Sequence, residues 1–498
     1  MGYTICTTNP NTGSGGFYNM YKIWNFHTGV SHPPLSGDLT CDAAVIGGGI
    51  TGVLCARALA RRGLSVALFE EHTVAHEGSK TARSTAKATA AHETAASAIA
   101  ENVSVEASRK YIAANLAGLR FLHELTGGEG TCDMYLYALH GERRLQREFR
   151  ALSDGGVVCE YLPGAPFTLS DTQQITAAVR IPGQLAVDPV GLAHRLCAEG
   201  SFAVFEHSPV TAAGRHTLTC GGHTVTAAHV IAATNYPVFH EASLPMKLTR
   251  KTSYAAAVRC ADGFRLPADI MAYGADGGFG YRFARDGEIL IVSGETHRGA
   301  AAPNAGQRLL RAAADAANGN IEIVRQWSNN DGYTHDGIPY IGQLRCGIHI
   351  ACGFGAWGMT NAAGAAVILA EQICGKGVWY DDLFSPYRNF LRGGMTPFAE
   401  HAGVAAGGLL RTMAPPPDRY ASEVAPGRAE IINYRGRRAG AYRDPDGQLH
   451  VVRLRCPHLG CCLEWNPEEK TWDCPCHGSR FDYTGKCISN PAETGIGL

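Results

Sequence analysis

The sequence predicts an α/β chain with a doubly wound unit, a mixed-sheet unit inserted into it, and a small all-β unit at the C-terminus. Between residues 43 and 70 a buried strand, a glycine-rich turn, an alanine-rich helix and a second strand follow one another, in the order of a βαβ unit. Alternating apolar and polar residues at 280–284 and 288–293 favour strands of a mixed sheet. Three prolines at 415–417 mark a linker, and the short strand and turn patterns after it predict the all-β unit.

The composition excludes several classes of protein. The 498 residues include 44 Lys and Arg against 45 Asp and Glu, which gives a net charge of -1. We expect no nucleic-acid partner, because binding phosphates requires a basic field. No stretch reaches the roughly 18 uninterrupted apolar residues of a membrane span, and the polar N-terminus lacks the layout of a signal peptide. The sequence therefore favours a cytoplasmic protein without a transmembrane segment.

Residues 42–70 carry a motif for binding a dinucleotide in a Rossmann-type fold. The glycines of G-x-G-x-x-G stand between the predicted strand and the predicted helix. Gly47 permits the tight turn, Gly49 lets the backbone approach a pyrophosphate, and Gly52 lets the helix pack on the strand. Glu70 ends the second strand, 18 residues after the last glycine, and can hold ribose hydroxyls. The motif alone does not decide between FAD and NAD.

A segment rich in small and hydroxyl side chains, EGSKTARSTAKATAAHE, follows the second strand. It can run back along the cofactor, where Ser79, Thr81, Arg83 and Ser84 would be available to the phosphates.

Residues 32 to about 385 resemble the DadA-like proteins of the glycine/D-amino-acid oxidase superfamily, which bind FAD. The segments HPPLSGDLTCDAAVIGGGITG and STAKATAAH look like the branch that carries a C-terminal iron–sulfur domain. HVIAATNYP at 229–237 matches a family strand that ends near the flavin, and ACGFGAWGMTNAAGAA at 351–366 matches a late glycine-rich turn. The resemblance implies that this turn places a helix N-terminus at the flavin pyrimidine carbonyl. The flavin contacts that it implies are Gly353, Gly355, Gly358, Met359 and Thr360.

Three histidines after the second strand are interpreted as polar residues without a special role. Some relatives attach flavin covalently through a histidine in this region, but we interpret His92 as an ordinary polar residue at a helix start. His72 and His76 fit a polar loop better than a metal site. Apolar residues at helical spacing then predict one long amphipathic helix over 95–125.

A cluster of cysteines and histidines lies near the C-terminus. Six of the 17 cysteines fall in the last 43 residues, and in a reducing compartment such a cluster indicates metal chemistry. Cys456 with His458, and Cys474 with His477, form two short pairs. Two thiolates and two imidazoles are also a zinc ligand set. Zinc modules usually pair Cys with Cys and His with His, however, whereas here each pair mixes one Cys with one His. Such mixed pairs are typical of a Rieske centre, in which two Cys bind one iron and two His bind the other. We therefore favour a Rieske 2Fe–2S cluster with these four ligands.

The same segment resembles the respiratory and photosynthetic Rieske proteins, which carry C-x-H-x-G-C and C-P-C-H-G-S. The resemblance implies a disulfide between Cys461 and Cys476 over the cluster. This chain departs from the respiratory proteins at Phe481, where they have tyrosine. Phenylalanine has no hydroxyl to donate to a ligand thiolate, so we expect a lower reduction potential than in that class.

A flavin paired with a one-electron cluster indicates a dehydrogenase that passes electrons to an external acceptor. The resemblance implies an amine or amino-acid substrate. Arg282 is the first candidate to bind a substrate carboxylate and Arg250 the second, with Tyr281 and Tyr254 as pocket residues. The alternative is an electron-transfer protein without its own small-molecule substrate. A Rieske oxygenase is disfavoured, because that class needs a mononuclear iron site in a large domain after the Rieske module, and only 21 residues follow His477.

These interpretations together predict the domain boundaries. We expect an N-terminal tail over the surface at 1–40, an FAD-dependent oxidoreductase at 41–400, a linker at 401–420 and a Rieske domain at 421–498. Within the oxidoreductase, the FAD-binding parts are 41–125, 180–240 and 335–385, and the substrate-domain parts are 126–179 and 241–334.

Overall fold

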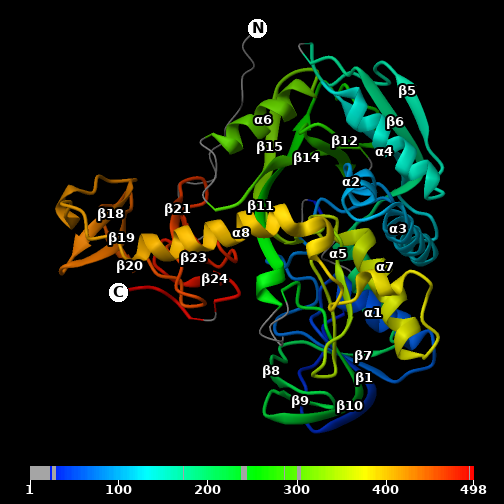
Figure 1. The fold of residues 1–498 in the computed structure, drawn as a ribbon, viewed down its shortest axis with the longest axis horizontal. Coiled ribbons are helices and arrows are strands. Elements are labelled where there is room, and N and C mark those ends of the chain that lie inside the picture. The colour runs from blue at the N-terminus through cyan, green and yellow to red at the C-terminus, as the bar shows by residue number, and fades with distance from the viewer. Residues whose placement is uncertain are drawn as a thin grey trace.

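The computed structural model describes residues 23–24, 30–171, 173–236, 244–284, 287–299, 304–492 and 494–498. Figure 1 shows two large sheets with their helices, one above the other, and a small β unit to one side. One helix, α8 (Leu391–Thr412), runs between the small unit and the rest of the molecule.

The first sheet has the strand order β16–β17–β10–β1–β2–β7, and a β8–β9 hairpin extends it at β10. The pairs β1–β10, β1–β2, β2–β7 and β10–β17 are parallel. Helices α1 and α7 contact this sheet, and α3 and α5 pack on those helices. The last four residues of β1 are buried, as in strands covered on both faces. The strands are β1 (Leu39–Ile46), β2 (Val66–Phe69), β7 (Ala203–Phe205), β8 (Val210–Ala213), β9 (Thr217–Cys220), β10 (His223–Ala232), β16 (Tyr340–Gln343) and β17 (Ile348–Cys352).

The second sheet is mixed, as predicted, and has the order β15–β11–β14–β13–β12–β4–β6–β3, with β5 paired to β6. Its β4–β12 pair is parallel and its other pairs are antiparallel. The short β3 comes from the segment after β2 and therefore ties that segment to the second sheet. The strands are β3 (Lys87–Ala88), β4 (Thr131–Ala138), β5 (Glu160–Pro163), β6 (Ala177–Ala186), β11 (Leu248–Cys260), β12 (Ile270–Gly274), β13 (Gly280–Ala284), β14 (Ile289–His297) and β15 (Ile321–Thr334).

The helix predicted over 95–125 is two helices. The chain breaks after α2, and Ser104, with an extended backbone, caps the start of α3 by accepting a hydrogen bond from the Ala107 amide at 3.0 Å. The apolar spacing continues across this break, so it could not reveal the break. The helices are α1 (Ile50–Ala60), α2 (Ala95–Asn102), α3 (Val105–Thr126), α4 (Glu142–Asp154), α5 (Pro189–Ala198), α6 (Ala305–Asp315) and α7 (Gly358–Ile373), and short 3-10 turns lie at Pro245–Lys247, Asp381–Phe384 and Ala421–Glu423.

The N-terminal segment is not only a surface tail. Ile23 and Trp24 are buried in the main hydrophobic core, and the Trp24 indole donates a hydrogen bond to the Ala82 carbonyl at 2.8 Å. Much of the predicted tail, residues 1–22 and 25–29, lies outside the described residues.

The C-terminal unit is all-β, as predicted, and α8 leads into it. α8 continues to Thr412, so the first part of the predicted 401–420 linker is helical and only the proline-rich part after it is not. No helix in the described ranges is long and apolar enough to cross a membrane. The unit consists of the antiparallel strands β18 (Ala429–Tyr434), β19 (Arg437–Arg443) and β20 (Leu449–Arg453), and of β21 (Glu464–Asn466), β22 (Thr471–Asp473), β23 (Arg480–Asp482) and β24 (Cys487–Ser489).

Candidate functional site

The glycine turn between β1 and α1 has no room for side chains. A Cβ on Gly52 would lie 1.9 Å from the Gly47 carbonyl oxygen, and a Cβ on Gly47 would lie 2.8 Å from the Ala233 oxygen at the end of β10. Gly47 also has a φ of 106°, which favours glycine. The turn therefore leaves the N-terminus of α1 accessible to an anionic group, as binding a pyrophosphate requires.

Two predicted polar residues contact this turn. The buried Glu70 carboxylate accepts a hydrogen bond from the Gly48 amide at 2.6 Å. The Thr81 hydroxyl accepts one from the Ile50 amide at 2.8 Å and lies 3.3 Å from the Cβ position of Gly49. Residues from three separate stretches of the sequence therefore meet at the start of α1.

The other polar residues of the segment after β2 lie differently. The Ser79 and Ser84 hydroxyls accept hydrogen bonds from the Ala82 and Ala86 amides, so in this structure they stabilise local turns. Within the described residues the buried Nε of Arg83 has no hydrogen-bond partner. The charges that act on the Arg83 guanidinium include Glu469 and Arg480 of the C-terminal unit, and no described contact places Arg83 at the first glycine turn.

The late glycine turn joins β17 to α7. Gly353 and Gly355 have φ angles of 79° and 59°, and a Cβ on Gly353 would lie 2.6 Å from the Thr334 methyl carbon. The Thr360 hydroxyl donates to the Thr89 carbonyl and accepts from the Thr89 amide, both at 2.9 Å. Thr360 therefore fastens the segment after β2 to the first turn of α7.

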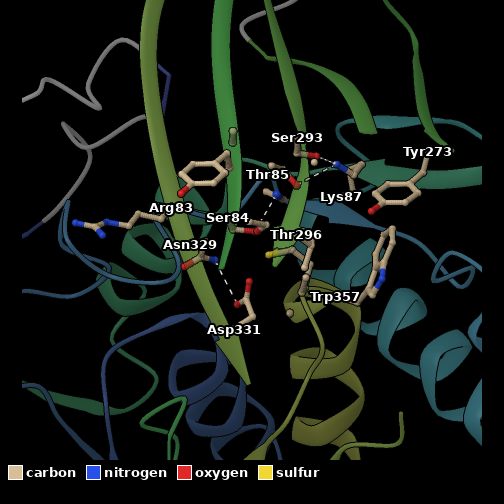
Figure 2. Close-up of a pocket in the computed structure, with 18 of the residues that line it drawn as sticks. Arg83, Ser84, Thr85, Lys87, Tyr273, Ser293, Thr296, Asn329, Asp331 and Trp357 are labelled. Carbon is tan, nitrogen blue, oxygen red and sulfur yellow. Dashed lines mark hydrogen bonds between the residues drawn. The ribbon is translucent and has the colours of Figure 1, made fainter. Parts of the chain in front are cut away.

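A pocket lies between these two segments and the second sheet (Figure 2). Four of the predicted cofactor-binding residues line it, namely Arg83, Ser84, Gly358 and Met359. In this pocket the Lys87 ammonium donates hydrogen bonds to the Thr85 and Ser293 hydroxyls at 3.0 and 3.3 Å. Burial, together with the positive charge of Arg282, lowers the pKa of Lys87 to about 7. Lys87 can therefore exchange a proton near neutral pH.

Acidic and aromatic residues complete the pocket. Glu93 forms side-chain hydrogen bonds with Tyr273 and Trp357, and burial raises the pKa of the Glu93 carboxyl. Figure 2 shows Tyr273 and Trp357 on the same side of the pocket as Lys87. Sequence reasoning did not identify Lys87, Glu93, Tyr273 or Trp357. Lys87 and Glu93 stand in the quoted motif, but only the fold reveals that they face the pocket.

Arg282 does not face a substrate. It is buried in β13, where its guanidinium donates to the backbone carbonyls of Phe283, Ala86 and Val187 at 2.9, 2.7 and 2.9 Å, and to that of Thr85 at 3.2 Å. Because backbone oxygens occupy these donors, we no longer assign Arg282 to a substrate carboxylate. It instead holds the segment that contains β3 in place.

The other substrate candidates also differ from expectation. Arg250 in β11 donates to the Asn490 side chain at 3.3 Å and therefore binds the C-terminal unit. Tyr254 lines the pocket, and its hydroxyl accepts a hydrogen bond from Asn466 at 3.4 Å. Tyr281 is buried in the core of the second sheet and does not line the pocket. The second sheet thus contacts the C-terminal unit at positions expected to contact substrate.

The four predicted cluster ligands come together in two loops of the C-terminal unit. The Cys456 and Cys474 thiols form a hydrogen bond, which lowers the pKa of Cys456 to about 7 and raises that of Cys474. The His458 and His477 rings meet edge to face, with centroids 5.0 Å apart. Among the described residues the buried Nδ1 of His477 has no hydrogen-bond partner. Two thiols and two imidazoles in this arrangement fit the ligand set of a Rieske cluster.

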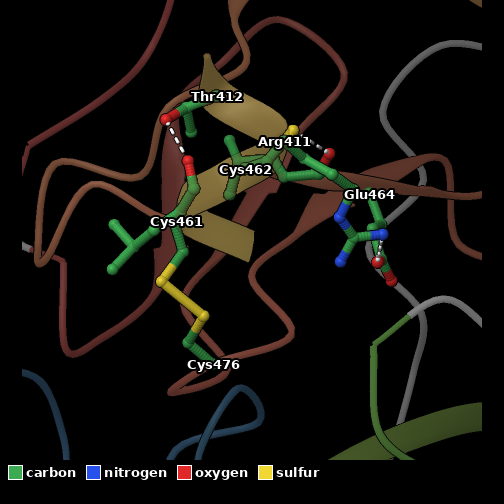
Figure 3. The surroundings of a disulfide bond; sticks show 8 residues. Arg411, Thr412, Cys461, Cys462, Glu464 and Cys476 are labelled. Carbon is green, nitrogen blue, oxygen red and sulfur yellow. Dashed lines mark hydrogen bonds and ion pairs between the residues drawn. A yellow bond between two sulfur atoms is a disulfide. The ribbon is translucent and has the colours of Figure 1, made fainter. Parts of the chain in front are cut away.

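A disulfide between Cys461 and Cys476 joins the two loops (Figure 3). Helix α8 packs directly against it, because a Cβ on Gly408 would lie 3.2 Å from the Cys476 sulfur. The Gly408 carbonyl also accepts a hydrogen bond from the Cys462 amide at 3.1 Å. α8 is therefore part of the surroundings of the cluster.

Three histidine rings extend from the predicted cluster site toward the late glycine turn. The buried His401 of α8 lies between His477 and His335, with ring centroids 5.2 and 5.3 Å away, and it hydrogen-bonds the backbone of Cys476. His335 follows Thr334, the residue that contacts Gly353. The row of imidazoles thus connects His477, a predicted cluster ligand, to the late glycine turn.

A cavity of about 1170 Å³ borders both predicted cofactor sites. Gly353, Gly355 and Trp357 of the late glycine turn line it, as do Glu464 and Pro475 of the C-terminal unit. The Arg411–Glu464 ion pair, with atoms 2.9 Å apart, lies at its edge (Figure 3). The late glycine turn and the loop that contains Pro475 therefore face one common space.

The predicted polar histidines differ in burial. His92 also lines this cavity, but it is buried: its Nδ1 lies 2.6 Å from the Tyr111 hydroxyl, and its ring stacks on Trp357. Burial lowers the pKa of His92 to about 3, so the ring is neutral. The rings of His72 and His76 lie edge to face after β2.

Comparisons with known proteins agree with this arrangement. The family model FAD dependent oxidoreductase (DAO) matches residues 42–372, and the model Rieske [2Fe-2S] domain matches residues 415–497. The chain is 28% identical over 496 residues to the putative Rieske 2Fe-2S iron-sulfur protein YhfW of Bacillus subtilis (strain 168), a match that covers 94% of this chain and 95% of that protein.

Two solved structures are similar in fold. L-amino acid deaminase from Proteus vulgaris matches with a TM-score of 0.58 and 15% identity, over 72% of this chain and 100% of that one. L-proline dehydrogenase from P.horikoshii matches with a TM-score of 0.58 and 16% identity, over 71% of this chain and 98% of that one. The chain therefore belongs to the FAD dependent oxidoreductase (DAO) family and carries a C-terminal Rieske domain, with FAD and a 2Fe–2S cluster as its cofactors.

Proposed function

We propose that this protein is an amine or amino-acid dehydrogenase that passes electrons from FAD to the Rieske cluster and on to an external acceptor. The observation that carries the proposal is the cavity shared by the late glycine turn and Pro475, which stands two residues before the cluster ligand His477. Two structural neighbours, an L-amino acid deaminase and an L-proline dehydrogenase, support the proposal of a CH–NH donor.

The residues of the two glycine turns are proposed to hold FAD. Bound FAD supplies a two-electron acceptor for hydride from a carbon next to nitrogen. We assign its pyrophosphate to the start of α1, its ribose to Glu70, and its flavin to the pocket beside the start of α7. Four cluster ligands are proposed, namely Cys456, His458, Cys474 and His477.

Lys87 is proposed as the group that accepts the substrate proton. An amine can give up a hydride only when its nitrogen carries a lone pair, so an ammonium substrate must first lose a proton. Lys87 lines the pocket, and its low pKa makes a neutral amine available near pH 7. The Thr85 and Ser293 hydroxyls fix the position of its nitrogen.

The experiment is an anaerobic addition of D-amino acids, glycine derivatives and proline to the purified protein, followed by absorption and electron paramagnetic resonance (EPR) spectroscopy. The proposal predicts that at least one amine bleaches the flavin and that a Rieske signal then appears. In a Cys474→Ser variant the same amine should bleach the flavin without that signal. If only dithionite or a reductase produces the signal, the protein is an electron carrier without an amine substrate.

A further inference from the structure

Helix α8 exposes an apolar stripe to solvent. The exposed fractions of Met395, Leu409 and Met413 are 60%, 45% and 80%, which is unusual for large apolar side chains on one helix face. Three exposed alanines lie between them, so the stripe consists of Met395, Ala399, Ala402, Ala406, Leu409 and Met413. We call these six residues the α8 stripe.

The α8 stripe follows the alternating spacing of four and three residues that aligns side chains along one helix face. Other residues of α8 contact the C-terminal unit or line the cavity. His401 and Gly408 pack against the C-terminal unit, and Glu400 and Arg411 line the cavity. Figure 1 shows α8 on the near side of the molecule, between the C-terminal unit and the two sheets. The stripe is therefore a continuous apolar surface that no described element covers.

We propose that the α8 stripe is the contact between two copies of this chain, paired as antiparallel helices. The stripe is nearly palindromic about position 404, with methionines at both ends and alanines at the centre. Two-fold symmetry requires such self-complementarity, because each patch must fit its own copy. A two-fold axis that crosses the stripe at the level of residue 404 places Ala402 of each copy against Ala406 of the other.

The size distribution of the side chains supports close packing of the two helices. Alanines at the crossing point let the helix axes approach, because the interaxial distance depends on the side chains at the contact. Nineteen residues from Met395 to Met413 span about 27 Å at 1.5 Å per residue. This length is sufficient for a contact over the whole stripe, and Leu410, which is 68% exposed, extends the apolar surface at its edge.

The charges near the α8 stripe argue against a membrane as its partner. Helices that lie on membranes flank their apolar face with Lys and Arg. On α8 the cation Arg411 is directed to the cavity side, where it pairs with Glu464, and Glu400 adds a negative charge. Arg392 is the remaining cation of this helix, and it stands at the non-helical start.

The test measures the mass of the holoenzyme by light scattering and by sedimentation over a range of concentrations. The native protein should be a dimer. Leu409→Glu with Met413→Glu places four charges in the contact and should raise the dimer dissociation constant at least about tenfold, which corresponds to about 1.4 kcal/mol. Ala402→Glu, a change at an exposed residue that leaves the large side chains in place, should have the same effect.

The matched control is Val158→Glu, since Val158 is 75% exposed outside α8. This variant should remain a dimer. A native protein that is monomeric at all concentrations would overturn the proposal, as would a dimer that persists in both α8 variants. Flotation with vesicles of phosphatidylcholine and phosphatidylglycerol provides a further test: binding that Ala402→Glu abolishes would assign the stripe to a membrane instead. The flavin and cluster spectra should be equal in all variants, so this test is independent of the proposed reaction.

Discussion

At Gly52 the structure leaves room for a hydrogen atom only, and we expect this to matter for binding of the cofactor. A methyl group there would overlap the Gly47 carbonyl oxygen, so Gly52→Ala must displace α1 or the turn. We expect a loss of roughly 1–3 kcal/mol of stability from overpacking and at least about a tenfold loss of FAD affinity. The measurement is the ratio of FAD to protein after purification. Gly37→Ala, where no atom lies within 4 Å of the new Cβ, should retain the native ratio.

Lys87 determines the expected pH dependence. Its pKa is lowered to about 7, so the amine is protonated below that pH and neutral above it. The rate of flavin reduction by an amine should therefore rise as the pH increases through about 7. Lys87→Met should remove this inflection and slow reduction by about 10²-fold or more, whereas Lys376→Met at an exposed site should keep both. The measurement is stopped-flow reduction of the flavin by an amine at several pH values. A pH profile that is the same in Lys87→Met as in the native protein would contradict the role of Lys87 as proton acceptor.

Phe481 is a residue whose effect on the cluster can be isolated. It is fully buried in the same apolar cluster as Cys456 and Cys474. Phe481→Tyr would supply a hydroxyl donor near the ligands and should raise the reduction potential by a few tens of millivolts, since 59 mV is a tenfold change for one electron. Phe481→Leu, which adds no donor, is the control in the redox titration. A potential that stays the same or falls in the tyrosine variant would contradict the expectation.

At the scale of elements, α8 contacts both the oxidoreductase part and the C-terminal domain. It carries His401 between the proposed cluster ligand His477 and His335, and it also lines the cavity. His401→Phe should leave the iron and sulfide content unchanged, because all four ligands remain. It should shift the EPR g-values and the potential, since the hydrogen bond to the Cys476 backbone is lost. His123→Phe, far from the cluster in sequence and on α3, should shift neither.

The motifs that the sequence revealed are those whose residues act within one short segment. The G-x-G-x-x-G turn and the two Cys–His pairs each combine ligand chemistry with fixed spacing, so both could be recognised without a structure. Arg282 was misassigned because alternation along a strand identifies a sheet face but not what covers that face. In the fold, backbone carbonyls of the β3 segment cover it. The break at Ser104 was missed for a similar reason, since apolar spacing continued across it.

At the scale of the whole molecule, the C-terminal domain is docked by buried polar contacts. Arg480, buried beside Asp473 and Glu469, donates to the Ser328 hydroxyl of β15 at 3.3 Å. The Asn330 side chain donates to the Gly478 carbonyl, next to the proposed ligand His477, at 3.1 Å. No sequence pattern could predict these contacts, because they join residues about 150 positions apart. They hold the cluster loops against the oxidoreductase part.

With this docking, the proposed function requires that the two redox centres exchange electrons within one chain, and that requirement can be tested directly. The measurement is anaerobic mixing with an amine that bleaches the flavin, followed by freeze-quench EPR of the cluster at two protein concentrations. The docked arrangement predicts that the Rieske signal grows with the same first-order rate constant at both concentrations. A rate that increases with protein concentration, or a bleached flavin beside a cluster that stays oxidised, would contradict it.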